Sequence, residues 1–133
     1  MASVIGNGVT LLGLNNADDY VTVNLASGIT EADEGKAVTW DASAANQMKL
    51  AGDGNPVHGY LDKVEKRDNE GILVGSVLMQ GFVKFPLLAS DPATYGDSVE
   101  GSNGGEVKKS TSAHSLNTVV DKGTNYVVVR LRA

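Results

Sequence analysis

Apolar and polar side chains alternate with a period of two along most of the chain after Asp19. In residues 20–25, Val21, Val23 and Leu25 share one face and the residues between them share the other. This alternation is the pattern of a half-buried β-strand. Similar runs end at clusters of Gly, Asn, Asp and Pro, spaced about 8–12 residues apart. We therefore predict an all-β fold, a small β-sandwich or β-barrel of about eight to ten short strands with an extended N-terminal arm.

Three internal segments have sharper signals. Residues 36–40 and 47–50 are expected to form a hairpin around the turn at Asp41-Ala42-Ser43. Residues 30–35 form either one short acidic helical turn capped by Thr30 or a loop. Residues 72–85 are the most strand-like stretch, apolar on both faces and ended by Pro86, and they are predicted as one central strand.

The first 19 residues follow neither the helical nor the strand period. Isolated Val, Ile and Leu side chains are separated there by Gly and Asn. Disordered tails carry fewer large apolar residues, so we predict an extended arm that docks on a partner or a neighbouring copy. A length of 133 residues allows one domain. The expected organisation is an arm over residues 1–19 and a single β domain over residues 20–133.

Charge is distributed unevenly along the chain. Eleven basic and sixteen acidic side chains give a net charge of −5, which repels a phosphate backbone, so no direct nucleic-acid binding is expected. No Lys or Arg precedes Lys36, whereas this part of the chain contains Asp and Glu. The acidic stretch would suit a basic partner surface, or it is a solvated face that aids solubility. The acidic residues that precede Lys36 are Asp18, Asp19, Glu31, Asp33 and Glu34.

Residues that carry enzyme chemistry are scarce. The absence of Cys excludes thiol catalysis, Cys-based zinc sites and disulfides. His58 and His114 are the only histidines and are far apart in the sequence. The nearest match to a nucleophile elbow, residues 96–100, lacks the final Gly. We predict no catalytic residues, no metal, no cofactor and no enzymatic activity. No apolar run approaches about 18 residues, so no membrane association is expected.

The order of the strand and turn segments matches a known pattern. Its segments are, in chain order, Gly35-Lys36-Ala37-Val38-Thr39-Trp40-Asp41, Met48-Lys49-Leu50, Pro56-Val57-His58-Gly59-Tyr60-Leu61, residues 74–85, Gly96-Asp97-Ser98-Val99 and Val127-Val128-Val129-Arg130-Leu131. This layout resembles the small capsid decoration proteins of tailed bacteriophages, also called cement or head-stabilising proteins, over about residues 30–133. The resemblance implies a non-catalytic homo-oligomer, a trimer more than a dimer. It also implies synthesis in the host cytoplasm, a place on the outer capsid surface of the virion, and the major capsid protein as partner.

On this resemblance we expect a protein that bridges neighbouring shell subunits and stabilises the head against internal DNA pressure. A clamp that binds the assembled lattice and not free subunits stabilises that lattice by mass action. The apolar arm residues would lie in a capsid groove or add a strand to an exposed edge, and the acidic residues would meet basic capsid residues. The capsid-binding residues predicted in this way are Ile5, Val9, Leu11, Leu12, Leu14, Asp18, Asp19, Glu31, Asp33 and Glu34.

A second function fits the same composition. Trp40, Tyr60 and Tyr95 could form an exposed surface on which sugar rings stack, or they could simply fill the core. In the first case the chain is a carbohydrate- or receptor-binding β module of a phage head fibre or tail.

Overall fold

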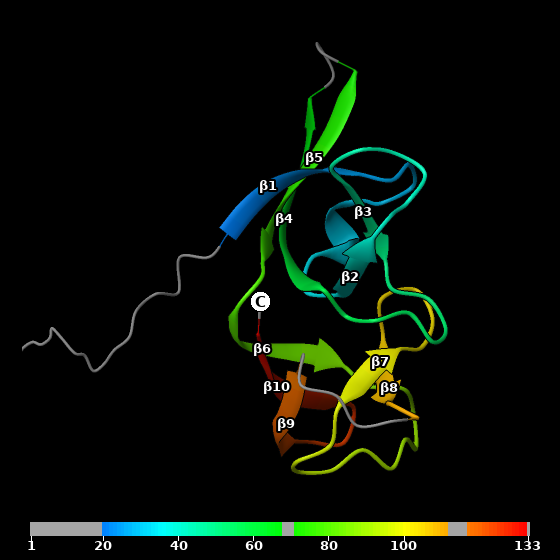
Figure 1. The fold of residues 1–133 in the computed structure, drawn as a ribbon, viewed down its shortest axis with the longest axis vertical. Helices are drawn as coiled ribbons and strands as arrows, with labels where there is room; N and C mark the ends of the chain where they lie inside the picture. Colours follow the sequence, from blue (N-terminus) through cyan, green and yellow to red (C-terminus); the bar gives the residue numbers. More distant parts are fainter. Residues whose placement is uncertain (1–19, 68–70, 112–116, 133) are drawn as a thin grey trace, which may run out of the picture.

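The computed structural model describes residues 20–67, 71–111 and 117–132, and Figure 1 shows their arrangement. This part of the chain contains ten β-strands, one 3₁₀ turn and no α-helix, which confirms the predicted all-β class. The predicted N-terminal arm lies outside the described residues. The elements are β1 (Tyr20–Leu25), η2 (Glu31–Asp33), β2 (Ala37–Trp40), β3 (Gln47–Leu50), β4 (Gly59–Arg67), β5 (Ile72–Leu78), β6 (Gly81–Pro86), β7 (Val99–Gly101), β8 (Val107–Lys109), β9 (Asn117–Lys122) and β10 (Tyr126–Leu131).

The first five strands form a closed barrel in the order β1-β3-β2-β4-β5. The predicted hairpin is confirmed, since β2 pairs antiparallel with β3 and Val38 faces Leu50. β5 pairs back onto β1, and the only parallel pair in the barrel is β1 with β3. The barrel interior is filled by buried side chains, namely Val23, Leu25, Ile29, Val38, Met48, Leu61, Val64 and Val77.

A glycine makes the tight barrel interior possible. A Cβ at Gly75 would lie 2.8 Å from Leu25 Cδ1 and 3.0 Å from Leu61 Cδ1, closer than side chains pack. The register of β4 against β5 shifts between Leu61 and Lys63, which pair with Val77 and Ser76, and Gly75 pairs with Val64 just beyond this shift. Gly75 therefore marks a close approach beside a bulge that curves the sheet.

The prediction of a single strand over residues 72–85 was wrong. The chain leaves the barrel after Leu78, and β6 begins at Gly81 in a different sheet. Gly81 has a φ of +136°, a backbone conformation that favours glycine. Because two successive strands can each bury one face, an apolar pattern on both faces did not require one strand covered on both sides.

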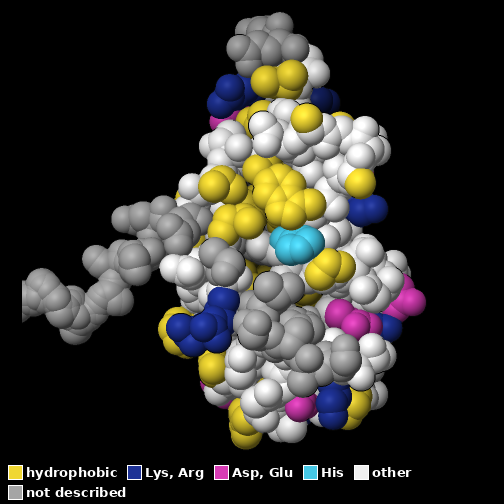
Figure 2. Space-filling view, viewed as in Figure 1, with side chains coloured by type: hydrophobic (Ala, Val, Ile, Leu, Met, Phe, Trp, Pro, Cys, Tyr) yellow, Lys and Arg dark blue, Asp and Glu magenta, His cyan; other side chains and the backbone are white. Residues whose placement is uncertain are grey.

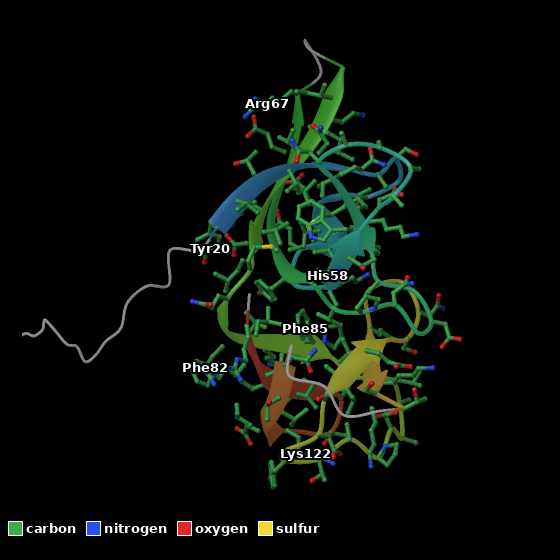
Figure 3. All side chains as sticks on the ribbon, in the orientation of Figure 1. Tyr20, His58, Arg67, Phe82, Phe85 and Lys122 are labelled. Carbon is green, nitrogen blue, oxygen red and sulfur yellow. The ribbon has the colours of Figure 1, made fainter. Side chains whose placement is uncertain are left out.

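The second half of the molecule consists of the sheet β6-β10-β9 and the hairpin β7-β8. Its core also includes residues of the barrel. Tyr60 of β4 packs against the fully buried Phe85 of β6, with ring centroids 5.8 Å apart. Figure 3 labels Phe85. The buried core residues are Ala37, Ala51, Val57, Leu78, Val83, Phe85, Leu87, Ala93, Val99, Val107, Val119, Val127, Val129 and Leu131.

Backbone hydrogen bonds attach the β7-β8 hairpin to the barrel. Gly101 N–H donates to Asn55 O at 2.7 Å, and Ala37 N–H donates to Gly105 O at 3.0 Å. Gly101 packs so closely that an added Cβ would collide with Gly52 O and lie 2.8 Å from Ala51 Cβ. The two halves therefore share both a core and a hydrogen-bonded junction. No helix in the described ranges is long and apolar enough to cross a membrane.

Candidate functional site

Most of the predicted capsid-binding residues lie in the first 19 residues, outside the part of the chain that the structure describes. These residues are Ile5, Val9, Leu11, Leu12, Leu14, Asp18 and Asp19. Glu31, Asp33 and Glu34 are described, and they lie in and directly after η2. Their proposed contacts with a capsid stay a prediction.

Asp33 holds the η2 turn together. Of the two alternatives for residues 30–35, the structure has the capped turn, since Thr30 Oγ1 accepts the Ala32 N–H at 3.3 Å. In return Asp33 Oδ2 accepts the Thr30 N–H at 3.0 Å, and Asp33 Oδ1 binds Lys36 Nζ at 3.0 Å. Partial burial raises the pKa of Asp33, but the hydrogen bond from Thr30 and the Lys36 ammonium outweigh it and lower the net pKa.

Glu34 fixes the turn to the barrel. Its Oε2 accepts the Val64 N–H of β4 at 2.9 Å. Glu31, in contrast, is exposed. Asp33 and Glu34 therefore have structural roles of their own, and Glu31 is the member of this group whose side chain is most open to a partner.

The outer face of the β6-β10-β9 sheet carries residues that the sequence analysis missed. Phe82 pairs with Arg130 and Lys84 pairs with Val128 across β6 and β10, and these side chains alternate with buried Val83, Phe85, Val127 and Val129. Phe82 is 66% exposed, the most exposed large apolar side chain among the described residues. We call Phe82, Lys84, Val128 and Arg130 the Phe82 patch. The alternation after Gly81 could have revealed it, had the strand been divided there.

The two cations of the Phe82 patch have no carboxylate partner among the described residues. Lys84 Nζ lies 4.2 Å from the centroid of the Tyr126 ring, a cation–π contact. In the sheet register the nearest carboxylate is Asp121 of β9, two strands away from Lys84. Its Oδ1 accepts the N–H of its own neighbour Lys122.

The start of β1 lies on the same side of the molecule as the Phe82 patch. Tyr20 pairs with Leu78 at the end of β5, and Leu131 at the end of β10 pairs with Gly81. Only Met79 and Gln80 separate these two pairing points. Tyr20 and Phe82 are 46% and 66% exposed, and both lie along the left side of Figure 3.

One edge of β1 is open at its beginning. Residues 20–23 pair with β5 on one edge, whereas β3 joins the other edge only from Asn24 onward. No described strand lies along residues 20–23 on that second edge. An open strand edge offers backbone donors and acceptors to an added strand.

The aromatic residues of the sugar-binding alternative are placed differently from one another. Trp40 is 43% exposed at the end of β2, and Tyr95 is 64% exposed in the connection between β6 and β7. Tyr60 is instead packed against the core beside Phe85. The Tyr60 ring is therefore not available as part of an exposed surface on which sugars stack.

His58 orders the backbone beside Trp40. Its Nδ1 accepts the Trp40 N–H at 3.3 Å and lies 3.0 Å from Thr39 Oγ1. An accepting Nδ1 places the proton of the neutral ring on Nε2. Burial lowers the pKa of His58 below its ordinary value. Figure 2 shows His58 next to a cluster of hydrophobic side chains on this face.

A groove runs between the projecting β4-β5 hairpin and residues 27–31. Its volume is about 770 Å³, and its walls mix apolar with oppositely charged side chains. Among the described residues no group of three or more His, Asp and Glu side chains is placed to hold a metal ion. The lining is formed by Ser27, Gly28, Ile29, Thr30, Glu31, Val64, Glu65, Lys66, Arg67, Gly71, Ile72 and Leu73.

Comparison with known proteins identifies no relative: no protein-family model matches the chain, and no curated protein matches its sequence.

Proposed function

We propose that this chain is a structural, non-catalytic protein that binds the outer surface of a tailed-phage capsid. In this proposal it bridges neighbouring shell subunits and stabilises the head against the pressure of the packaged DNA. It acts as a homo-oligomer, a trimer more than a dimer, with the major capsid protein as partner. The proposal combines the sequence resemblance with one structural observation.

That observation is the start of β1. Residues 20–23 continue directly from the arm, have an open strand edge, and carry the exposed side chains of Tyr20 and Val21. β1 is also a member of a closed barrel, so the arm is joined to a body whose strands support one another on both sides. A short apolar arm attached to such a body can transmit force between the subunits that it contacts.

Bridging does not require one tight contact. Several weak contacts made by one oligomer act together, because each contact raises the effective concentration of the next. Binding to the closed lattice and not to free subunits then stabilises the lattice.

The copy number of the chain in the particle tests this function. Purified, salt-washed particles from the natural source are analysed by quantitative mass spectrometry against the major shell protein. A ratio near one to one, or a simple fraction of it, is expected for lattice-wide decoration. A few copies per particle would indicate a fibre or tail module, and absence from the particle would overturn the proposal.

Removal of the arm tests the role of residues 1–19. The chain lacking these residues is expected to fold, by far-UV circular dichroism, but to lose binding to shells. Unchanged binding would remove the arm from the mechanism.

The exposure of Trp40 supports the second candidate, a carbohydrate- or receptor-binding module. An exposed indole beside a polar imidazole is a surface on which a sugar ring can stack. A glycan array probed with the wild-type chain and with Trp40→Ala separates the two candidates. Sugar binding that is lost in the folded variant favours the module, and the absence of any bound glycan removes it.

A further inference from the structure

We propose that the Phe82 patch is a second docking surface, which binds an acidic surface of the shell protein next to the site of the arm. This inference rests on the proposed capsid-binding function and extends it to a part of the chain that the resemblance did not assign. The proposed contact with the shell then has two parts, the arm and the outer sheet face, and both attach from the same side of the molecule.

The first argument is the contrast between two phenylalanines of one strand. Phe85 is fully buried, whereas Phe82, three residues earlier in β6, is 66% exposed. The half-buried Val128 and the 45%-exposed Val120 extend this apolar surface over β10 and β9. A single exposed apolar residue needs no explanation, but an aromatic ring that projects beside further apolar side chains is typical of an interface anchor.

The second argument is charge. The protein has a net charge of −5, yet Lys84 and Arg130 flank Phe82 with no carboxylate partner among the described residues. Carboxylates elsewhere in this half are engaged near the β7-β8 hairpin. Asp97 and Glu100 lie 3.8 Å from Lys109 Nζ and 3.7 Å from Lys108 Nζ, respectively. Cations left unpaired around an apolar anchor fit an acidic partner surface.

The third argument is position. The pairs Tyr20–Leu78 and Gly81–Leu131 place the start of β1 and the end of β10 on either side of a two-residue connection. The start of β1, with its open edge, therefore lies near the Phe82 patch. Figure 2 shows Lys and Arg side chains next to hydrophobic ones along the left margin of the lower half, the side on which Tyr20 and Phe82 lie in Figure 3.

An acidic protein surface fits better than nucleic acid. The acidic chain as a whole repels a phosphate backbone, and two cations supply little compensation. A carboxylate-bearing surface with an apolar hollow would instead contact Phe82 directly and pair with Lys84 and Arg130 at its rim. Rim charges mainly accelerate association and make it dependent on salt, whereas the buried anchor slows dissociation.

The test measures binding of purified full-length variants to shells from which this chain has been stripped. Phe82→Ser and the double variant Lys84→Glu/Arg130→Glu are each expected to weaken binding about tenfold or more. The matched controls are Tyr95→Ser, which removes a ring that is 64% exposed elsewhere, and Lys63→Glu, which reverses an exposed charge on β4. Both controls are expected to bind within about twofold of the wild type, since their sites lie outside the patch.

Salt dependence provides a second readout that misfolding would not imitate. The wild-type dissociation constant is expected to rise between about 50 and 300 mM salt, and the rise is expected to be smaller for Lys84→Glu/Arg130→Glu. Circular dichroism and the thermal midpoint of each variant confirm that the variants are folded.

The outcomes separate this inference from the proposed function. If the wild-type chain does not bind stripped shells, the capsid-binding function fails and this inference fails with it. If the wild type binds, arm deletion abolishes binding and the patch variants bind normally, the function stands and the inference is overturned. Binding of the wild type to a duplex DNA oligonucleotide that Lys84→Glu/Arg130→Glu abolishes would also overturn it, in favour of nucleic acid.

Discussion

The barrel and the sheet of β6, β9 and β10 differ in closure: the barrel is closed, and the sheet is open. Each barrel strand pairs with a neighbour on both sides, although residues 20–23 of β1 are paired on one edge only, and the interior is filled by side chains of the barrel itself and of the turn after β1. The second sheet is open, and its core is completed by Ala37 and Leu78 of the barrel strands and by Ala51 and Val57 of the connection between β3 and β4. Closure leaves the barrel with only short open edges, such as residues 20–23 of β1, whereas the second sheet has open edges and an outer face available for contacts. The unpartnered cations and the exposed Phe82 accordingly lie on the open sheet.

The shared core also predicts that the two halves unfold together. The side chains that join them, Tyr60 and Phe85, come from different sheets, and the hairpin is hydrogen-bonded to the barrel through Gly101 and Gly105. Substitutions at this junction should therefore destabilise the whole molecule, whereas substitutions on the outer face should change its stability by about 1 kcal/mol or less.

The largest effect is expected for Phe85→Ala. Removing a fully buried ring from the shared core should lower the free energy of unfolding by about 3–5 kcal/mol, through lost burial and the cavity left behind. Urea denaturation followed by tryptophan fluorescence and by far-UV circular dichroism measures it, and the two signals should keep a common midpoint. Phe82→Ala on the same strand is the control and should change stability by less than about 0.5 kcal/mol. Two separated transitions in the wild type would contradict a shared core.

A smaller but still large effect is expected for Asn117→Ala. Asn117 is fully buried at the start of β9, where its Oδ1 accepts the Val99 N–H at 2.8 Å and its Nδ2 donates to Val99 O at 3.1 Å. In this half of the molecule, the side-chain amide of Asn117 thus satisfies backbone groups that a neighbouring strand satisfies in the barrel. Leaving both backbone groups of Val99 unsatisfied should cost about 2–4 kcal/mol. The exposed Asn103→Ala is the control in the same denaturation assay, and equal effects of the two substitutions would refute this role.

The barrel is expected to weaken in acid through His58. Burial places the folded-state pKa of His58 below its ordinary 6.5, so the unfolded chain binds this proton more readily. The contribution is intact above about pH 6.5 and is lost as the pH falls through the folded-state pKa. A protonated Nδ1 could also no longer accept the hydrogen bond from the Trp40 N–H. Denaturation midpoints between about pH 7.5 and 4.5 should fall less for His58→Gln than for the wild type. Parallel curves for both proteins would exclude His58 as the cause.

The smallest effect is expected for Lys84→Met on the open sheet. The substitution keeps an unbranched side chain but removes the charge 4.2 Å from the Tyr126 ring. An exposed cation–π contact of this kind is worth about 0.5–1 kcal/mol. Lys63→Met on the barrel serves as control, and the thermal midpoints of the two variants provide the comparison. A thermal midpoint of Lys84→Met above that of the wild type would contradict this prediction and show that the Lys84 ammonium destabilises the folded chain.

Local sequence signals determined the all-β class and several of the strands and turns of this protein. Alternation with a period of two predicted the all-β class, the hairpin of residues 36–50 and a range of about eight to ten strands, of which the described part of the chain has ten. Thr30 offered a capped turn as one of two alternatives for residues 30–35, and the structure has that turn. These features depend on neighbours within a few residues of each other, so the order of side chains along the chain is enough to determine them.

Only the tertiary structure decided which strands became neighbours. The parallel pairing of β1 with β3, the exit from the barrel at Gly81 and the burial of Asn117 all depend on segments far apart in the sequence. Alternation states which side chains share a face but not what covers that face. Phe82 and Phe85 belong to one apolar stretch, and their opposite burial follows from the sheet that β6 joined and from the barrel residues that cover only its inner side.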